Sequence, residues 1–190
     1  MSTSDRRTLI ADTAIATVAA AGLRGLTHRA IDTAAALPAG STSYYFRTRT
    51  ALIGACYARI EELDLDDIEP ARPASREEAA ARLGETLHRW LTSGRERQLA
   101  RYELSLEAAR TAELGSAFHR AGLASRARAA AVLAALGAAR PRESAELLVA
   151  WTEGVLFDRL AGAMARTRPA PDLAELTAVA GRMLDAALKS

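Results

Sequence analysis

Apolar residues recur every three to five positions along most of the chain, which is the spacing expected for one face of an α-helix. The first such stripe runs from Leu9 to Ala19 and predicts a helix over about residues 6–21. Gly22 is well placed just after its C-terminus, where glycine commonly ends a helix. Thr27 is a favourable N-cap for a second helix, because its hydroxyl can accept a bond from a free amide of the first turn.

The second helix has to end near Leu37, because a proline disfavours helical geometry in the residue before it. Pro38 itself is tolerated in the first turn of a helix, so a short third helix is expected over about residues 38–45. A longer amphipathic helix then begins near Thr48.

After an acidic, proline-containing loop at residues 64–75, Ser75 and Glu78 form a capping-box pattern that marks another helix start. No segment shows the alternation typical of a strand. From the fourth helix on, the helical patterns cover about residues 48–63, 75–92, 95–110, 113–136, 142–166 and 172–188. The sequence therefore predicts an all-α fold of about nine helices, with a three-helix domain at residues 1–47 and a larger helical domain at residues 48–190.

Composition adds limits on partners and location. No apolar run approaches the roughly 20 residues that span a bilayer, and the N-terminus lacks the apolar segment of a signal peptide. The single cysteine, Cys56, cannot form an internal disulfide, so we expect a cytoplasmic protein with no membrane partner. Residues 1–50 carry six arginines against three aspartates, a net charge of +3, so the cationic excess lies in the N-terminal domain.

Two short helices after a longer one form a helix-turn-helix pattern, in which the last helix enters the DNA major groove. Residues 39–43 (AGSTS) are small, which lets a backbone approach base edges closely, and the hydroxyls of Ser41 and Thr42 can bond to them. Three of the nine aromatic residues of the chain follow at once, at positions 44–46. We expect one ring to pack in the core and a phenol to reach a phosphate.

The stretch GLRGLTHRAIDTAAALPAGSTSYYFRTRTALI, residues 22–53, resembles the DNA-binding domain of the TetR family of transcriptional regulators. The family form there is Gly-x-x-x-(Leu/Thr)-Thr-x-(Arg/x)-x-Ile-Ala, then Gly-Val-Ser-x-Gly-(Thr/Ser)-Leu-Tyr-Tyr-His-Phe-x-Ser-Lys-x-x-Leu. The residues that fit are Thr27, Arg29, Ile31, Gly40, Ser41, Tyr44, Phe46, Arg49 and Leu52. The departures include Ser43 in place of a tyrosine, Tyr45 in place of a histidine and Pro38 in place of the capping serine, and Arg49 substitutes for the usual lysine.

The resemblance implies a two-fold dimer that binds a palindromic operator in double-stranded DNA. It implies base-edge contacts from Ala39, Gly40, Ser41 and Arg29, and backbone contacts from Thr27, Ser43, Tyr44, Tyr45 and Arg49. A purely structural interpretation exists for some of these residues: Tyr44 can be packing and Thr27 only a helix cap.

For the larger domain, the resemblance implies a small-molecule site and a homodimer formed through the last two helices. The residues agree in part, because both helices carry an apolar stripe that needs a partner, and Ala150 and Gly154 allow another helix to approach closely. The alternative is that both are internal core helices.

A ligand pocket is expected around the helix at 95–110, where Leu99, Tyr102 and Leu106 mark an inward face. Glu103 and Arg110 lie on or beside that face, either as an ion pair without a ligand or as the polar groups of an apolar pocket. The candidate ligand-binding residues are Trp90, Tyr102, Glu103, Leu106, Arg110, Phe118, Trp151 and Phe157, whose rings can equally be core.

Catalysis finds no support in the sequence. The three histidines lack metal-ligand spacing, and no phosphate loop, nucleophile or metalloprotease motif occurs, so we expect no catalytic residue, metal or cofactor. The function predicted is a repressor that an unidentified small molecule releases from DNA. The alternatives are a small all-α enzyme and a helical interaction module that does not bind DNA.

Overall fold

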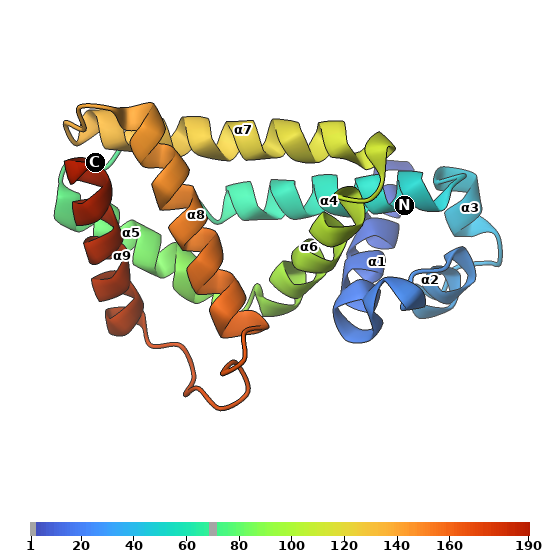
Figure 1. The fold of residues 1–190 in the computed structure, drawn as a ribbon. Coiled ribbons are helices and arrows are strands. Elements are labelled where there is room, and N and C mark those ends of the chain that lie inside the picture. The colour runs from blue at the N-terminus through green and yellow to red at the C-terminus, as the bar shows by residue number, and fades with distance from the viewer. Residues whose placement is uncertain (1–2, 69–71) are drawn as a thin grey trace. The chain divides into compact units, whose positions relative to one another are not determined.

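The computed structural model describes residues 3–68 and 72–190, and these form nine α-helices with no strand (Figure 1). The helices are α1 (Thr3–Gly25), α2 (His28–Ala34), α3 (Ser41–Tyr45), α4 (Arg49–Asp66), α5 (Arg76–Leu91), α6 (Arg95–Ala108), α7 (Ala112–Ala135), α8 (Pro141–Leu160) and α9 (Leu173–Lys189). This confirms the predicted all-α fold. The chain divides into two compact units, residues 1–65 with 96–119 and residues 66–95 with 120–190.

The first unit is built on a core to which all of its helices contribute. Ile10 of α1, Ile31 of α2, Leu52 of α4 and Leu104 of α6 are fully buried in it. Phe46, directly after α3, is buried in the same cluster, as expected for the last of the three adjacent rings.

Local start and stop signals predicted several helix ends. Gly22 has φ +65°, a conformation that favours glycine, and breaks the regular helix near the end of α1. The Thr27 hydroxyl accepts from the amide of Ala30 at 3.1 Å, and the Ser75 hydroxyl accepts from the amide of Glu78 at 3.1 Å. The Glu78 carboxylate accepts in turn from the amide of Ala74 at 2.5 Å.

The expected start of the third helix at Pro38 is wrong, because α3 begins at Ser41. The connection from α2 contains two residues in the left-handed region, Ala36 at φ +51° and Gly40 at φ +89°. The amide of Leu37 donates to the carbonyl of Asp32 at 2.8 Å, which closes α2 in the manner of a Schellman motif. Pro38 is therefore part of the turn between the helices.

The second unit contains α5, α8, α9 and the later part of α7. Its core includes Ala79 of α5, Leu133 of α7, Leu148 of α8 and Leu184 of α9. α5 and α9 lie side by side (Figure 1), and a Cβ on Gly84 would come within 2.7 Å of the Thr177 Cα. α8 ends at Leu160, six residues before the predicted end at 166.

Candidate DNA interface and ligand cavity

A buried carboxylate fixes α3 to α2. Asp32 is only 5% exposed, and its Oδ1 accepts from the amide of Thr42 at 2.7 Å and from the Thr42 hydroxyl at 2.6 Å. Its Oδ2 accepts from the amide of Gly40 at 2.8 Å. Burial alone would raise the pKa of Asp32, but the bonds from Thr42 and Gly40 outweigh it and hold that pKa below its ordinary value. The first turn of α3 is thus held by three charge-assisted bonds.

Most of the residues predicted to contact DNA lie on the surface of the first unit, on α2, on α3 and in the short segments that flank α3. Tyr44 is 79% exposed and its ring meets that of Tyr45 edge to face at 5.1 Å. Tyr45 is half-buried against the core, and Ser41 is also half-buried. The exposed members of the set are Thr27, Arg29, Ala39, Gly40, Ser43, Tyr44 and Arg49.

Arg49 has partners within the unit that were not predicted. Its Nη1 lies 3.1 Å from a carboxylate oxygen of Glu107, and its Nη2 donates to the carbonyl of Leu23 at 2.9 Å. A phosphate contact from Arg49 would compete with these bonds, so its expected contact with the DNA backbone stays a prediction.

Two residues that the sequence did not single out hold the end of α3. The His28 Nε2 donates to the carbonyl of Phe46 at 2.7 Å. Arg7 donates to the carbonyl of Tyr45 at 3.1 Å, and its guanidinium lies 4.4 Å from the centre of the Phe46 ring. These contacts join positions 18 and 38 residues apart, so no local pattern could have revealed them.

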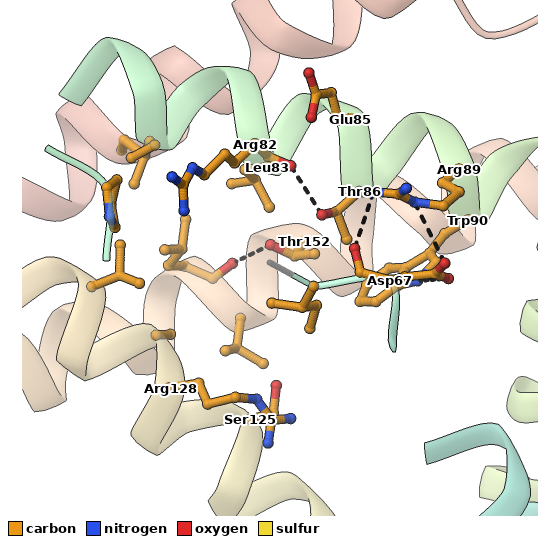
Figure 2. Close-up of a pocket in the computed structure, with 18 of the residues that line it drawn as sticks. Asp67, Arg82, Leu83, Glu85, Thr86, Arg89, Trp90, Ser125, Arg128 and Thr152 are labelled. Carbon is orange, nitrogen blue, oxygen red and sulfur yellow. Dashed lines mark hydrogen bonds and ion pairs between the residues drawn. The ribbon is translucent and has the colours of Figure 1, made fainter. Parts of the chain in front are cut away.

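The second unit contains a cavity of about 590 Å³, a size suited to a small organic ligand. Its walls come from α5, α7, α8, one residue of α9 and the segment at the end of α4 and just after it (Figure 2). Apolar side chains that line it include Leu83, Trp90, Val132, Leu148 and Leu184. Asp67, Arg82, Arg89, Ser125, Arg128 and Glu153 are among the polar residues.

One corner of the cavity is closed by an acidic residue that follows α4. The Asp67 carboxylate accepts from the Trp90 indole at 3.1 Å and lies 3.5 Å from the Arg89 Nε. Arg89 also donates to the Asp67 carbonyl at 3.0 Å. These bonds join the end of α5 to the segment after α4, as the dashed lines in Figure 2 show.

Of the eight residues predicted to bind a ligand, only Trp90 lines this cavity. Five of them belong to the first unit: Tyr102, Glu103, Leu106, Arg110 and Phe118. Phe118 stacks on Tyr57 with ring centres 3.5 Å apart. In the second unit, Trp151 packs against the core and Phe157 is 48% exposed.

The inward face predicted for the helix at 95–110 is wrong. Leu106 is 56% exposed, and the core side of α6 is formed by Ala100, Leu104 and Ala108, spaced four residues apart. The prediction followed the largest side chains, whereas close packing here uses alanines. Arg110 donates to the Leu106 carbonyl at 3.2 Å, and the described residues show no ion pair between it and Glu103.

Neither a membrane span nor a metal cluster is present in the described part of the chain. None of its helices combines the length and apolar character needed to cross a bilayer. No three histidine, cysteine, aspartate or glutamate side chains converge there in a way that could hold a metal ion.

Comparison with known families identifies the chain. The family model of the tetracyclin repressor-like C-terminal domain matches residues 74–189. The chain belongs to the TetR family. It is therefore a transcriptional regulator of a family that is not enzymatic, as the sequence led us to expect.

Solved structures of TetR-family proteins match nearly the whole chain. A member from Streptomyces coelicolor A3 is 29% identical, covering 94% of this chain and 98% of its own, with a TM-score of 0.74. The multidrug binding protein EbrR complexed with ethidium is 28% identical over 96% of this chain and 99% of its own, with a TM-score of 0.70. A regulator from Rhodococcus sp. at 18% identity shares the fold over 97% and 99% of the two chains, with a TM-score of 0.79. Among proteins with curated descriptions, none matches the chain significantly.

The last two helices of this TetR-family chain differ in what they leave exposed. Leu176, Ala180 and Leu184 of α9 are fully buried, so that apolar stripe serves the core of its own unit. On α8, Leu147 is 40% exposed and Phe157 is 48% exposed. Ala150 and Gly154 lie between them on the same helix and are also exposed. α9 leaves only Leu173, its first residue, exposed among its large apolar side chains, at 42%, so α8 exposes more large apolar side chains than α9 does.

Proposed function

We propose that this TetR-family regulator is a repressor that binds a palindromic operator as a homodimer in the cytoplasm and is released by a small molecule in the cavity of the second unit. The observation that carries the DNA-binding part is the first turn of α3, which is exposed on its outer side and held from within by Asp32. A rigid, thin helix start of this kind suits insertion into a major groove.

Small residues at positions 39–41 lie where the turn enters α3, so bases can approach the backbone closely. Arg29 on α2 is exposed and can reach a base edge, most naturally the acceptors of a guanine. The exposed phenol of Tyr44 can donate to a phosphate oxygen, which fixes register without reading sequence. These roles are the ones that the family resemblance implies.

The roles of Arg29 and Tyr44 are tested by titrating two single variants against an operator duplex selected from random DNA. Arg29→Ala is expected to weaken operator binding by about tenfold to a hundredfold, as for one lost base contact, and to weaken binding to random DNA less. Tyr44→Phe is expected to weaken both equally, because it removes a phosphate contact. Arg24→Ala, also an exposed arginine, is the matched control. If both variants kept the affinity and the selectivity of the wild type, the DNA contacts assigned to Arg29 and Tyr44 would be refuted.

The dimer is proposed to form chiefly through the exposed face of α8, with α9 alongside it. Leu147, Ala150, Gly154 and Phe157 recur at helical spacing, and the small pair between the larger residues lets a second copy approach. A two-fold dimer presents two identical copies of α3, which requires a palindromic operator whose half-sites lie about one turn of DNA, or a multiple of it, apart.

Release by a small molecule rests on the cavity and on the relatives. EbrR, 28% identical to this chain, is a multidrug binding protein whose complex with ethidium has been solved. In this chain the cavity wall includes Asp66, the last residue of α4, and Asp67. α4 has 18 residues, a length of about 27 Å, and starts three residues after Phe46. A ligand that moves the end of α4 can therefore change the position of α3.

The coupling is tested by measuring operator affinity for the free protein and for protein saturated with a bound compound. Thermodynamic linkage requires that the operator lower the affinity for the compound by the same factor by which the compound lowers the affinity for the operator. Equal operator affinities in the two states would refute ligand-controlled release while leaving DNA binding intact.

A further inference from the structure

We propose that the cavity binds an amphipathic organic anion, with its acidic group held by Arg128 and Ser125 of α7. The proposal rests on the proposed function in that it names the chemical class of the effector. The observations that support it concern the side chains that line the cavity. Most of the charged side chains among them already have partners.

The other two arginines that line the cavity are neutralised within the second unit. Arg89 pairs with Asp67 at 3.5 Å, and Arg82 pairs with Glu78 at 2.5 Å. The hydroxyls of Thr86 and Thr152 donate to backbone carbonyls one turn earlier in their own helices, at 2.9 and 2.8 Å. The charges of these two arginines are therefore already paired, and both threonine hydroxyl hydrogens are already donated.

Arg128 and Ser125 differ from that group. Both are half-buried, and across residues 3–68 and 72–190 neither forms a side-chain hydrogen bond or ion pair. They are three residues apart on α7, so they lie on the same face of the helix, and Figure 2 shows them together at one end of the lining residues. The pair offers a guanidinium and a hydroxyl as donors into the same space.

Arg128 is half-buried in the cavity wall, and its guanidinium has no acceptor among the described residues, so an anion in the cavity can bond to it without breaking an existing ion pair. A carboxylate or a similar anion supplies the acceptors, and the planar fork of arginine binds it through two parallel bonds. The rest of the wall is largely apolar, including Val132, Leu148 and Trp90. An occupant that satisfies both needs has a single anionic end and a hydrophobic body.

The competing occupant is a cation. Four carboxylates line the cavity; Asp67 and Glu153 already have partners, whereas Asp66 and Glu85 are exposed and could attract a cation. Exposed carboxylates are already hydrated, so they gain less from a ligand than the half-buried Arg128 does. We therefore favour the anion and make the cation an outcome of the test.

The experiment is calorimetric titration of the full-length protein, without DNA, with three probes that share one ring system: naphthalene-2-carboxylate, 2-naphthylmethanol and 2-naphthylmethylammonium. The carboxylate is expected to bind at least tenfold more tightly than the alcohol, with the ammonium weakest. Arg128→Gln is expected to abolish this preference, and Arg128→Lys to retain part of it. Arg126→Gln is the matched control, because Arg126 is on the same helix, pairs with Glu146 and does not line the cavity.

Any of four results would overturn the proposal. They are equal affinities for the three probes, tightest binding of the ammonium, no binding of the carboxylate, and an unchanged preference for the carboxylate in Arg128→Gln. If Arg128→Gln does not fold, Ser125→Ala takes its place. We then expect the affinity for the carboxylate to fall a few-fold, and an unchanged affinity would contradict the proposal. Operator titration with bound carboxylate keeps the two proposals apart. A preference for the anion with unchanged operator affinity would leave this inference standing and remove ligand-controlled release.

Discussion

Replacing Asp32 by alanine removes the acceptor that holds the first turn of α3. Three donors lose their partner: the amide of Gly40 and the amide and hydroxyl of Thr42. Gly40 is exposed, so its amide can bond to water instead, whereas the Thr42 side chain is fully buried. The main loss therefore arises at Thr42.

A buried donor left without an acceptor costs about 1–3 kcal/mol. With two such donors at Thr42 and some relaxation of the turn, we expect Asp32→Ala to lower the free energy of unfolding of the first unit by about 3 kcal/mol. Asp12→Ala is a matched control on α1, because its exposed ion pair with Arg59 at 2.9 Å is expected to contribute at most about 1 kcal/mol.

The assay is urea unfolding followed by circular dichroism, together with hydrogen exchange of the α3 amides. Thr42→Val removes one donor without changing the shape of the side chain, so a double-mutant cycle with Asp32→Ala should give a coupling energy of at least about 1 kcal/mol. Additive effects, or unchanged exchange at Thr42 in Asp32→Ala, would refute the role of the carboxylate as the clamp on α3.

The same carboxylate gives a pH dependence with a defined sign. The folded-state pKa of Asp32 is lowered, so its contribution is fully present above the unfolded value of about 4 and is lost as the pH falls through the folded value. The stability difference between wild type and Asp32→Asn should therefore be larger at pH 7 than at about pH 2. A difference that does not change with pH would contradict the hydrogen-bond account of the lowered pKa.

Three further outcomes are expected. Ala36→Gly should raise the free energy of unfolding by about 0.5 kcal/mol because it relieves a left-handed alanine at φ +51°, whereas Ala35→Gly at φ −84° should lower it. Burial raises the pKa of Cys56 to about 12, so a disulfide reagent at about pH 8 should label it only in urea, and labelling of the folded protein would contradict this. Leu147→Glu should give monomers in light scattering whereas Leu123→Glu, exposed on α7, should leave dimers; a dimeric Leu147→Glu would argue against the α8 surface.

Features that depend on neighbouring residues were predictable from the sequence. The Thr27 cap and the glycine at position 22 act within one helical turn, so residue type alone indicated them. The same holds for the small residues that begin α3. The nine helices within residues 3–68 and 72–190 followed from periodicity, which reports the existence of a helix more reliably than its ends.

Features that depend on which faces meet were not predictable. The polar pair of Asp32 and Thr42 takes positions where the family form has alanine and leucine, and ten residues separate them in the sequence. On α6 the largest apolar side chains indicated the wrong face, because Ala100 and Ala108 pack inward around Leu104. The cavity could not be found from single helices, since its walls come from segments that meet only in the folded chain.

The central claim, recognition of a palindromic operator by a dimer through α3, is tested most directly by selecting DNA sequences from a random pool with the full-length protein. The account predicts enrichment of a two-fold symmetric sequence with half-site centres about one helical turn, or a whole multiple of a turn, apart. It also predicts that Asp32→Ala, whose α3 is no longer held, enriches that sequence far less. No enriched sequence with the wild type, or the same palindrome enriched equally by both proteins, would contradict the account.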